Sequence, residues 1–556
     1  MINNKTTNIM RRRNFIKLTS TASALSLLPT EVFALFKSAG MTTCPDSNSK
    51  KIVLIQLAGA NDGLNTIVPF NQYDTYATLR PNIKLNNVGS SNGMINLDST
   101  LALTNQVGLH PSLIGFKNLY DKGFMRIIQG VGYPSQDKSH FKSTDLWLTG
   151  GDGTLANNYF DSGWIGRFLE NYYTGFLNSN FPLGIQLGSS DNSLGFHGVI
   201  EHGMSLNISG QDLSGFYSVI NGLGGTPPTN IPDSEYGDLI QYIINNDAST
   251  NSYAQTITNS FNSGSNSLTY PNTSLSNQLK TVARFISGGL QTKVYLVKVG
   301  GFDTHDKQVA ANNTTHLGNH ATLLTQISEA INSFITDLNN QNMGNDVVAV
   351  TFSEFGRKAG ENASLGTDHG EIAPMFVFGN AINPGISGTN INLSEAVSTN
   401  NYQVRTVQHD YRRVFSTILQ DWFGTSNKTL DLTFYNHTTN TGFSNNKIAD
   451  LIKAQNVINS TCYNDNLLST NEYQNIYEVI VYPNPVSELI TISSPNNNDV
   501  HAVSIYSIDG KFIGKYKNPL VNGQFSINIE NLSVGFYNLK IETKNGVFSK
   551  KIIVRR

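Results

Sequence analysis

Short apolar runs alternate with longer amphipathic stretches between residues 51 and about 425. The runs are rich in Val and Ile, as expected of strands that are buried on both faces of a parallel sheet. We predict strands in the segments KIVLIQLA, FMRIIQGV, FPLGIQLG, KVYLVKVG, VVAVTFS and PMFVFG. The pattern therefore predicts an α/β domain with a mainly parallel sheet covered by helices.

Two of the amphipathic stretches have helical periodicity. Residues 318–339 place apolar side chains at three- and four-residue spacings, which is typical of a crossover helix; these are Leu323, Leu324, Ile327, Ile331, Phe334 and Leu338. Residues 410–423 repeat the pattern, with Asp410 as the expected cap and Gly424 as the expected end.

Two segments outside these elements differ from the rest of the chain in composition and in the pattern of apolar residues. Residues 190–290 contain a polar insertion rich in Gly, Ser and Asn, with helices expected near 234–246 and 275–289. From about residue 475, short alternating strands are separated by turn residues, which indicates a small β-sandwich. We predict a leader at 1–45, the α/β domain at 46–450, a linker at 451–474 and the sandwich at 475–556.

The N-terminus predicts export. Arg12 and Arg13 precede Phe15, Ile16 and Lys17 and a modest apolar stretch, an arrangement that resembles a twin-arginine signal. No later segment has the roughly 18 consecutive apolar residues of a membrane-spanning helix, so we expect no stable membrane insertion. The 40 acidic and 38 basic residues nearly cancel, which argues against binding to nucleic acid. The two cysteines, Cys44 and Cys462, allow one disulfide and exclude a thiolate metal site.

Carboxylates and imidazoles follow the predicted strands. In an open α/β sheet the ends of the parallel strands meet at one crevice, so Asp62, Asp303 and Asp368 are expected to lie near one another. His305 and His369 accompany the second and third of these carboxylates. Oxygen and nitrogen ligands together favour zinc, manganese or iron over calcium. The alternative for each segment alone is a turn-forming or helix-capping Asp and a loop His.

Other residues near the strand ends are candidates for catalysis. Ser139 stands at a predicted helix start, where free backbone N–H groups favour an anion, so it is a candidate nucleophile, with Ser135 and Thr144 as rivals. The alternative role for Ser139 is an N-cap. Arg357 is a candidate for binding the oxygens of a tetrahedral oxyanion, and an ion pair with Glu354 is its alternative.

Two resemblances add to these predictions. Tyr482-Pro483-Asn484-Pro485, the Ser507–Lys511 hairpin, Gly535-Phe536-Tyr537 and the ending Arg555-Arg556 resemble the C-terminal sorting domain of type IX secretion. That resemblance implies passage through the periplasm, with the twin-arginine and type IX machineries as partners, to the cell surface or the medium. A carbohydrate-binding sandwich is the alternative.

The motifs LAGANDGLNTIVPF, SHFKSTDLW, GFDTH, TFSEFGR, GTDHG and HDYRRVFSTILQDWFG resemble the exported bacterial family called domain of unknown function 1501, over residues 50–425. That family is related to the alkaline phosphatase and sulfatase superfamily, which implies one or two divalent metals. By this analogy Asp62, Asp368 and His369 share one ion, and Asp303, His305 and His409 the other. The Asp303-x-His305 spacing is shorter than the Asp-x-x-x-His of alkaline phosphatase, and the Cys/Ser-x-Pro-x-Arg motif of sulfatases is absent.

The resemblance implies hydrolysis of phosphate or sulfate esters, with a small-molecule or glycan ester as substrate. A surface protein that binds or scaffolds on the same fold without turnover is the alternative. Loss of turnover of aryl esters in both Asp62→Ala and Ser139→Ala would distinguish the two hypotheses.

Overall fold

The computed structural model forms two compact units, Met1–Tyr463 and Asn464–Arg556. It describes residues 49–154, 162–173, 179–188, 194–198, 205–208, 253–311, 313–434, 447–458, 480–484, 486–493, 500–507, 511–517, 524–543 and 546–555. The predicted leader, both cysteines and the helix expected near 234–246 lie outside these residues.

The central sheet of the first unit contains all six predicted strands. They are β1 (Lys51–Leu57), β5 (Met125–Gly132), β6 (Gly184–Leu187), β8 (Val294–Val299), β9 (Val347–Phe352) and β10 (Ala373–Phe378). The described residues add β7 (Ser205–Ile208), β11 (Gly385–Ser387) and β12 (His409–Asp410), and the order is β11-β5-β10-β9-β1-β8-β6-β7 with β12 beside β5. Every pair is parallel except those of β10 with β5 and β9. The mainly parallel sheet is confirmed.

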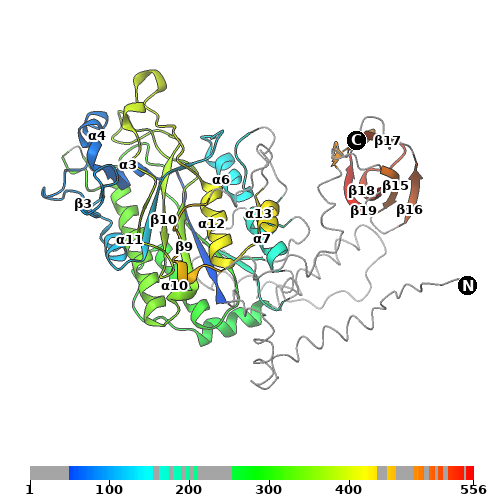
Figure 1. Ribbon diagram of the computed structural model, residues 1–556, viewed down its shortest axis with the longest axis horizontal. Helices are drawn as coiled ribbons and strands as arrows, with labels where there is room; N and C mark the ends of the chain where they lie inside the picture. Colours follow the sequence, from blue (N-terminus) through cyan, green and yellow to red (C-terminus); the bar gives the residue numbers. More distant parts are fainter. Residues whose placement is uncertain are drawn as a thin grey trace, which may run out of the picture. The chain divides into compact units, whose positions relative to one another are not determined.

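Helices cover both faces of this sheet (Figure 1). On one face pack α5 (Ile114–Asp121), α10 (Ser274–Ser287) and α11 (Asn319–Asn340). On the other pack α6 (His140–Thr149), α7 (Trp164–Tyr172), α12 (Tyr411–Phe423) and α13 (Asn427–Thr433). The strands therefore bury side chains on both faces, which explains their continuous apolar runs.

The predicted helices have the predicted ends and faces. In α11 the side chains of Leu324, Ile327, Ile331, Phe334 and Leu338 are buried, and each contributes about 1.5–3 kcal/mol by leaving water. Asp410 caps α12 by accepting a hydrogen bond from the backbone of Arg412, and Gly424 ends the helix with a φ of 78°. α10 corresponds to the helix expected near 275–289.

Shorter elements complete the first unit. A small antiparallel sheet consists of β2 (Ile67–Pro69), β3 (Ile95–Asn96) and β4 (Val107–Leu109). Its neighbours are α3 (Gly63–Thr66) and α4 (Tyr73–Leu79). The 3-10 helices are η3 (Phe70–Gln72), η6 (Leu194–Phe196), η7 (Gly344–Asp346), η8 (Leu393–Glu395), η9 (Ser398–Asn400) and η11 (Ala454–Asn456).

Strand direction brings several loops to one edge of the sheet. β1, β8 and β9 are mutually parallel, and β5 runs with them because β10 is antiparallel to both β5 and β9. β10 consequently begins at the edge where the other four strands end. Gly59, with a φ of 113°, lets the loops after β1 and β8 approach closely, since a Cβ there would lie 2.4 Å from the backbone nitrogen of Asp303.

The second unit is the predicted β-sandwich. One sheet has β13 (Ile480–Tyr482), β14 (Leu489–Ser493) and β17 (Gln524–Asn528). The other has β15 (Val500–Ser507), β16 (Phe512–Tyr516), β18 (Gly535–Thr543) and β19 (Gly546–Val554). Side chains of both sheets, such as Ile490 and Leu539, share one buried core. The two sheets therefore pack face to face, as the alternating pattern of apolar residues predicts.

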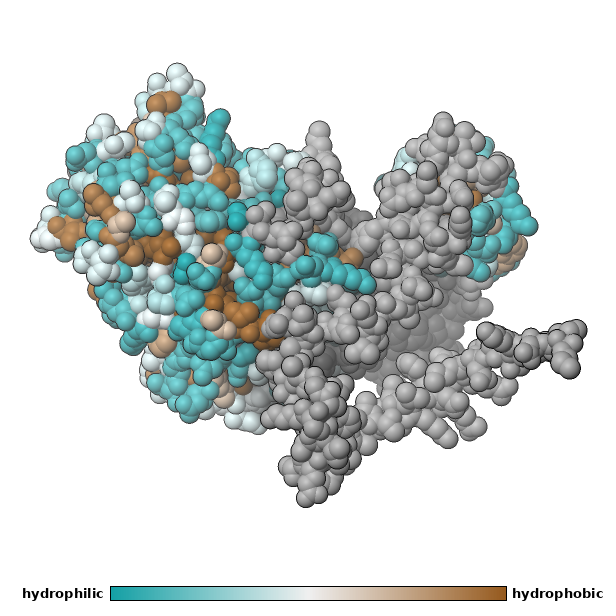
Figure 2. All heavy atoms as spheres, in the orientation of Figure 1, coloured by the Kyte–Doolittle hydropathy of each residue, from teal (hydrophilic) through white to brown (hydrophobic). Residues whose placement is uncertain are grey.

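Hydrophilic and apolar residues are interspersed on the face that Figure 2 shows, and scattered apolar residues are usual on soluble surfaces. Within the described part of the chain, no helix combines the length and the apolarity needed to cross a bilayer.

Candidate metal centre

Four side chains converge at the edge where the parallel strands end. His140 begins α6, Asp303 and His305 follow β8, and His369 precedes β10. The Nε2 atom of His369 lies 2.9 Å from Nε2 of His305 and 3.1 Å from Nε2 of His140. Oδ1 of Asp303 lies 3.5, 3.2 and 3.4 Å from the Nε2 atoms of His140, His305 and His369.

These distances fit the ligands of a single cation. Metal–ligand bonds of about 2.0–2.1 Å in tetrahedral geometry place the ligand atoms about 3.3–3.4 Å apart. Candidate ligand atoms of His140, Asp303 and His369 all lie within 4.8 Å of one another, and His305 contacts two of the three residues. Lone pairs facing one another at this range repel unless a cation or protons lie between them.

The Nδ1 atom of each of the three imidazole rings also has a hydrogen-bond partner. Nδ1 of His140 lies 2.7 Å from a carboxylate oxygen of Glu354, and Nδ1 of His369 lies 2.9 Å from the carbonyl of Lys138. Nδ1 of His305 lies 3.3 Å from a carboxylate oxygen of Asp368. Each Nδ1–H therefore has an acceptor, which assigns the tautomer that turns an Nε2 lone pair to the centre.

Glu354 binds the start of α6 to the sheet. Its backbone carbonyl accepts hydrogen bonds from the Ser143 hydroxyl and, at 2.9 Å, from the Trp147 indole. Its carboxylate accepts from the backbone N–H of Gly59 at 2.8 Å as well as binding His140. The hydrogen bond to Glu354 raises the pKa of His140, although burial opposes it, whereas burial lowers the pKa of His369.

The side chain of Arg357 binds Asp303 and is not exposed to solvent. Its guanidinium is buried and donates to Asp303 at 2.6 Å. Each of its three nitrogens also donates to backbone carbonyls, those of Ala60, Thr367, Gly59 and Phe302. Burial alone would raise the pKa of Asp303, but the hydrogen bond and charge of Arg357 outweigh burial and lower it. Asp303 is therefore an anionic ligand at neutral pH. Arg357 and Glu354 each bind a different partner.

Of the six predicted metal ligands, Asp303, His305 and His369 meet. Asp368 contacts the ring of His305 from behind and binds Lys358 at 3.2 Å. His409 lies on β12, opposite Val131 of β5, and is not part of the converging group.

Asp62 lies in a buried ion pair. Its two oxygens bind Arg80 at 2.6 and 2.9 Å, and neither side chain is exposed. Gln308 donates to the same carboxylate at 2.6 Å, and Asp62 also caps α3. Both oxygens of the Asp62 carboxylate, which the sequence predicted as a metal ligand, therefore accept hydrogen bonds from Arg80 or Gln308 instead.

His140 is the member of the centre that the sequence analysis missed. His140 directly follows Ser139, and the segment was interpreted only as the source of a nucleophile. The signal available was a third imidazole that follows a predicted strand, at the same edge as two others. Ser139 itself is the exposed N-cap residue of α6, without a side-chain capping bond. Its rival Thr144 lies one turn further along the same helix.

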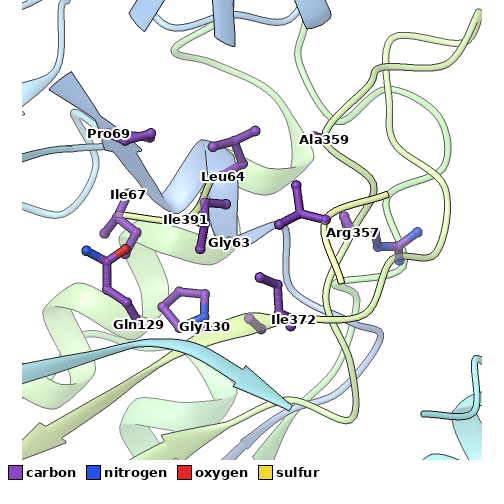
Figure 3. A pocket seen from close by; sticks show the side chains of 13 residues that line it. Gly63, Leu64, Ile67, Pro69, Gln129, Gly130, Arg357, Ala359, Ile372 and Ile391 are labelled. Atoms are coloured by element: carbon purple, nitrogen blue, oxygen red, sulfur yellow. The ribbon is translucent and has the colours of Figure 1, made fainter. Parts of the chain in front are cut away.

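A pocket of about 520 Å³ adjoins the centre, and a smaller cavity lies to one side. The pocket is lined by His140, Thr144, Asp303 and Glu354, among others. The smaller cavity, of about 30 Å³, has mostly apolar walls such as Leu64, Ile67 and Ile372, and the guanidinium of Arg357 is directed away from it (Figure 3). It can hold a water molecule but no organic ester.

The hydrogen bond from His140 to Glu354 leads to a first prediction. We expect Glu354→Ala to lower affinity for zinc by about 10–100-fold, because outer partners of this kind orient the ligand imidazole. Glu354→Gln should recover part of the loss, since an amide oxygen still accepts from Nδ1. Competition with a chromogenic chelator measures both. The matched control is Glu329→Ala, an exposed position on α11, and wild-type affinity in Glu354→Ala would contradict the positioning role.

Two family matches agree with the resemblances in the sequence. The family described as protein of unknown function (DUF1501) matches residues 280–429, a segment that contains Asp303, His305 and His369 but begins well after residue 50. The secretion system C-terminal sorting domain matches residues 480–555. The sorting-domain resemblance is confirmed, and the resemblance to the family of unknown function is confirmed over residues 280–429. The sorting domain indicates export to the cell surface or the exterior.

Solved structures that match include three enzymes. Alkaline phosphatase from the Antarctic bacterium TAB5 is 12% identical, over 61% of this chain and 94% of that chain, with a TM-score of 0.25. The PsFucS1 sulfatase from Pseudoalteromonas sp. is 8% identical, over 86% and 83%, with a TM-score of 0.30. The lipoteichoic acid synthase LtaP from Listeria monocytogenes is 13% identical, over 62% and 69%, with a TM-score of 0.26. No curated protein matches the chain.

Proposed function

We propose that the protein is an exported, metal-dependent hydrolase of phosphate or sulfate esters. The observation that carries the proposal is the cluster of His140, Asp303 and His369, whose ligand atoms all lie within 4.8 Å of one another, with Nε2 of His305 a further 2.9 Å from His369 and 3.2 Å from Asp303. The resemblance of the motifs to a family related to alkaline phosphatases and sulfatases supplies the ester class. A twin-arginine signal and the sorting domain together account for the proposed route through the periplasm.

The described residues supply a ligand group for one divalent ion in His140, Asp303 and His369, and His305, which contacts Asp303 and His369, is a further candidate ligand. Three nitrogens and one oxygen favour zinc, with manganese and iron as alternatives. When bound, such an ion supplies Lewis acidity, which neutralises negative charge that develops on ester oxygens.

The surrounding residues prepare the ligands for this task. Arg357 keeps Asp303 ionised and in place, and Glu354 and Asp368 hold the Nδ1 protons of two ligand histidines. Arg357 is thus proposed as a positioning residue, because the protein already accepts hydrogen bonds from all its nitrogens. The hydroxyl of Ser139, which immediately precedes a ligand, remains the proposed nucleophile, with Ser135 and Thr144 as its rivals.

Metal analysis combined with an ester panel tests the proposal. The full chain, exported from a host that has both secretion systems, is expected to contain about one equivalent of transition metal. It should hydrolyse 4-nitrophenyl phosphate, bis(4-nitrophenyl) phosphate or 4-nitrocatechol sulfate. Dialysis against a chelator should abolish turnover, and one metal should restore it.

The outcomes separate the hypotheses. Bound metal with no turnover on any ester would favour the binding or scaffolding alternative. Absence of bound metal, together with no uptake on addition of zinc, manganese or iron, would remove the basis of both the centre and the hydrolase.

A further inference from the structure

The 520 Å³ pocket beside the metal centre has an unusual floor. Parallel strands covered on both faces normally carry apolar residues, yet Gln56 of β1, Lys298 of β8 and Gln186 of β6 line this pocket. Gln56 is the register neighbour of Lys298, and Gln186 is opposite Leu296 two residues before it. Three polar side chains therefore lie side by side near the ends of three adjacent strands.

The wall opposite this floor is one face of α6. His140, Phe141, Thr144, Asp145 and Leu148 line the pocket, at the spacings that place residues on one side of a helix. Phe141 is 87% exposed although it directly follows a metal ligand. An aromatic ring held in water next to a metal centre has no packing role in the described fold, and its face is available to a ligand.

The rim has little side-chain bulk. A Cβ at Gly300 would meet no atom within 4 Å, and Gly301 has a φ of 100°. Backbone groups on this side are therefore accessible to a ligand that enters from solvent. The pocket volume is within the usual range for a small-molecule site.

We propose that this pocket binds the sugar ring of a sulfated or phosphorylated glycan and presents its ester group to the metal centre. The inference rests on the proposed hydrolase. A sugar ring has an apolar C–H face and a hydroxyl edge, which match an aromatic wall and an amide floor. The amide of Gln56 supplies two donors and an acceptor oxygen, so this single side chain can bind neighbouring hydroxyls. The aromatic face is electronegative and attracts the C–H groups.

A nucleotide, which also stacks on aromatic rings, is the competing class. The described pocket offers one aromatic wall and an amide-rich floor rather than an arginine cluster for several phosphates. These observations favour the sugar ester.

Titration calorimetry on the full chain loaded with zinc tests the pocket directly. The probes are N-acetylglucosamine 6-sulfate, galactose 6-sulfate, glucose 6-phosphate, the three sugars without the ester, and adenosine monophosphate. We expect at least one sugar ester to bind more tightly than its parent sugar and than the nucleotide. Phe141→Ala and Gln56→Leu should each weaken that binding by about tenfold, the effect of one lost contact of this kind.

Controls keep the result interpretable. Ile114→Ala removes another exposed apolar side chain, one that does not line the pocket, and should leave binding unchanged. Zinc content is measured for every variant, so that a damaged centre is recognised. Because Phe141 is exposed, its removal leaves the core intact.

The proposal and the hydrolase can fail separately. A sugar ester that binds through Phe141 and Gln56 but is never hydrolysed supports the pocket and contradicts the hydrolase. Absence of binding to all sugar esters, tighter binding of the nucleotide, or wild-type affinity in both variants would overturn the pocket, even if aryl esters are turned over.

Discussion

His140→Ala is expected to lower the affinity of the centre for zinc by more than about 100-fold, because removal of an outer partner alone costs about 10–100-fold. The substitution deletes one of the three ligand residues that all lie near one another, while α6 retains its contacts through Ser143 and Trp147 with the carbonyl of Glu354. Ester turnover, if present, should be lost with the metal. Competition with a chelator of known affinity measures the change, and circular dichroism verifies the fold.

Two further variants make this prediction sharp. His409→Ala is expected to keep zinc affinity within about twofold of wild type, because His409 lies on β12 outside the converging group. His501→Ala, on the exposed surface of the second unit, controls for general loss of a histidine. Strong loss of zinc in His409→Ala, with none in His140→Ala, would restore the ligand set that the superfamily analogy implies and contradict the one proposed.

The sheet could be predicted from the sequence because burial on both faces leaves a strong signal. Val53, Ile55 and Leu57 face one helical layer, and Ile52 and Leu54 face the other, so the run from Ile52 to Ile55 has no polar gap. The same argument explains why β7, β11 and β12 were missed. They are short strands at or near the sheet margins, where a single apolar face leaves too few residues to form a pattern.

The sequence predicts where the centre lies, but it predicts only some of the residues that form it. Strand direction brings Asp303, His305 and His369 to one edge, which follows from topology alone. Spacing cannot show whether a strand-end carboxylate meets a metal or an arginine. Asp62 meets Arg80, which is 18 residues away in a stretch without a recognisable pattern. Arg357 likewise contacts Asp303, which lies 54 residues earlier in the chain, so no local spacing reveals the pair.

Arg80→Met is expected to lower the free energy of unfolding by about 3–5 kcal/mol, which is the cost of leaving a buried charge without its partner. Arg80 is fully buried, binds both oxygens of Asp62 and donates to the carbonyls of Lys358 and Ala359. It thereby joins the loop after β1 to the loop that carries Asp368. Guanidinium denaturation followed by tryptophan fluorescence measures the change, since Trp147, Trp164 and Trp422 all lie in the first unit.

The matched control is Lys117→Met, which breaks the more exposed Lys117–Asp121 pair and should cost at most about 0.5 kcal/mol.

The pH dependence of the free energy of unfolding is a second test of the Arg80 prediction. Burial would raise the pKa of Asp62, but Arg80 outweighs it and the pKa is lowered. The pair therefore stabilises the wild type above the unfolded-state pKa, and this contribution is lost as the pH falls through the folded-state pKa. In Arg80→Met the buried carboxyl has lost its arginine, so protonation relieves the penalty and the deficit relative to wild type should shrink as the pH falls. A deficit that is the same at pH 7 and pH 4.5 would show that lost packing, rather than an uncompensated charge, destabilises the variant.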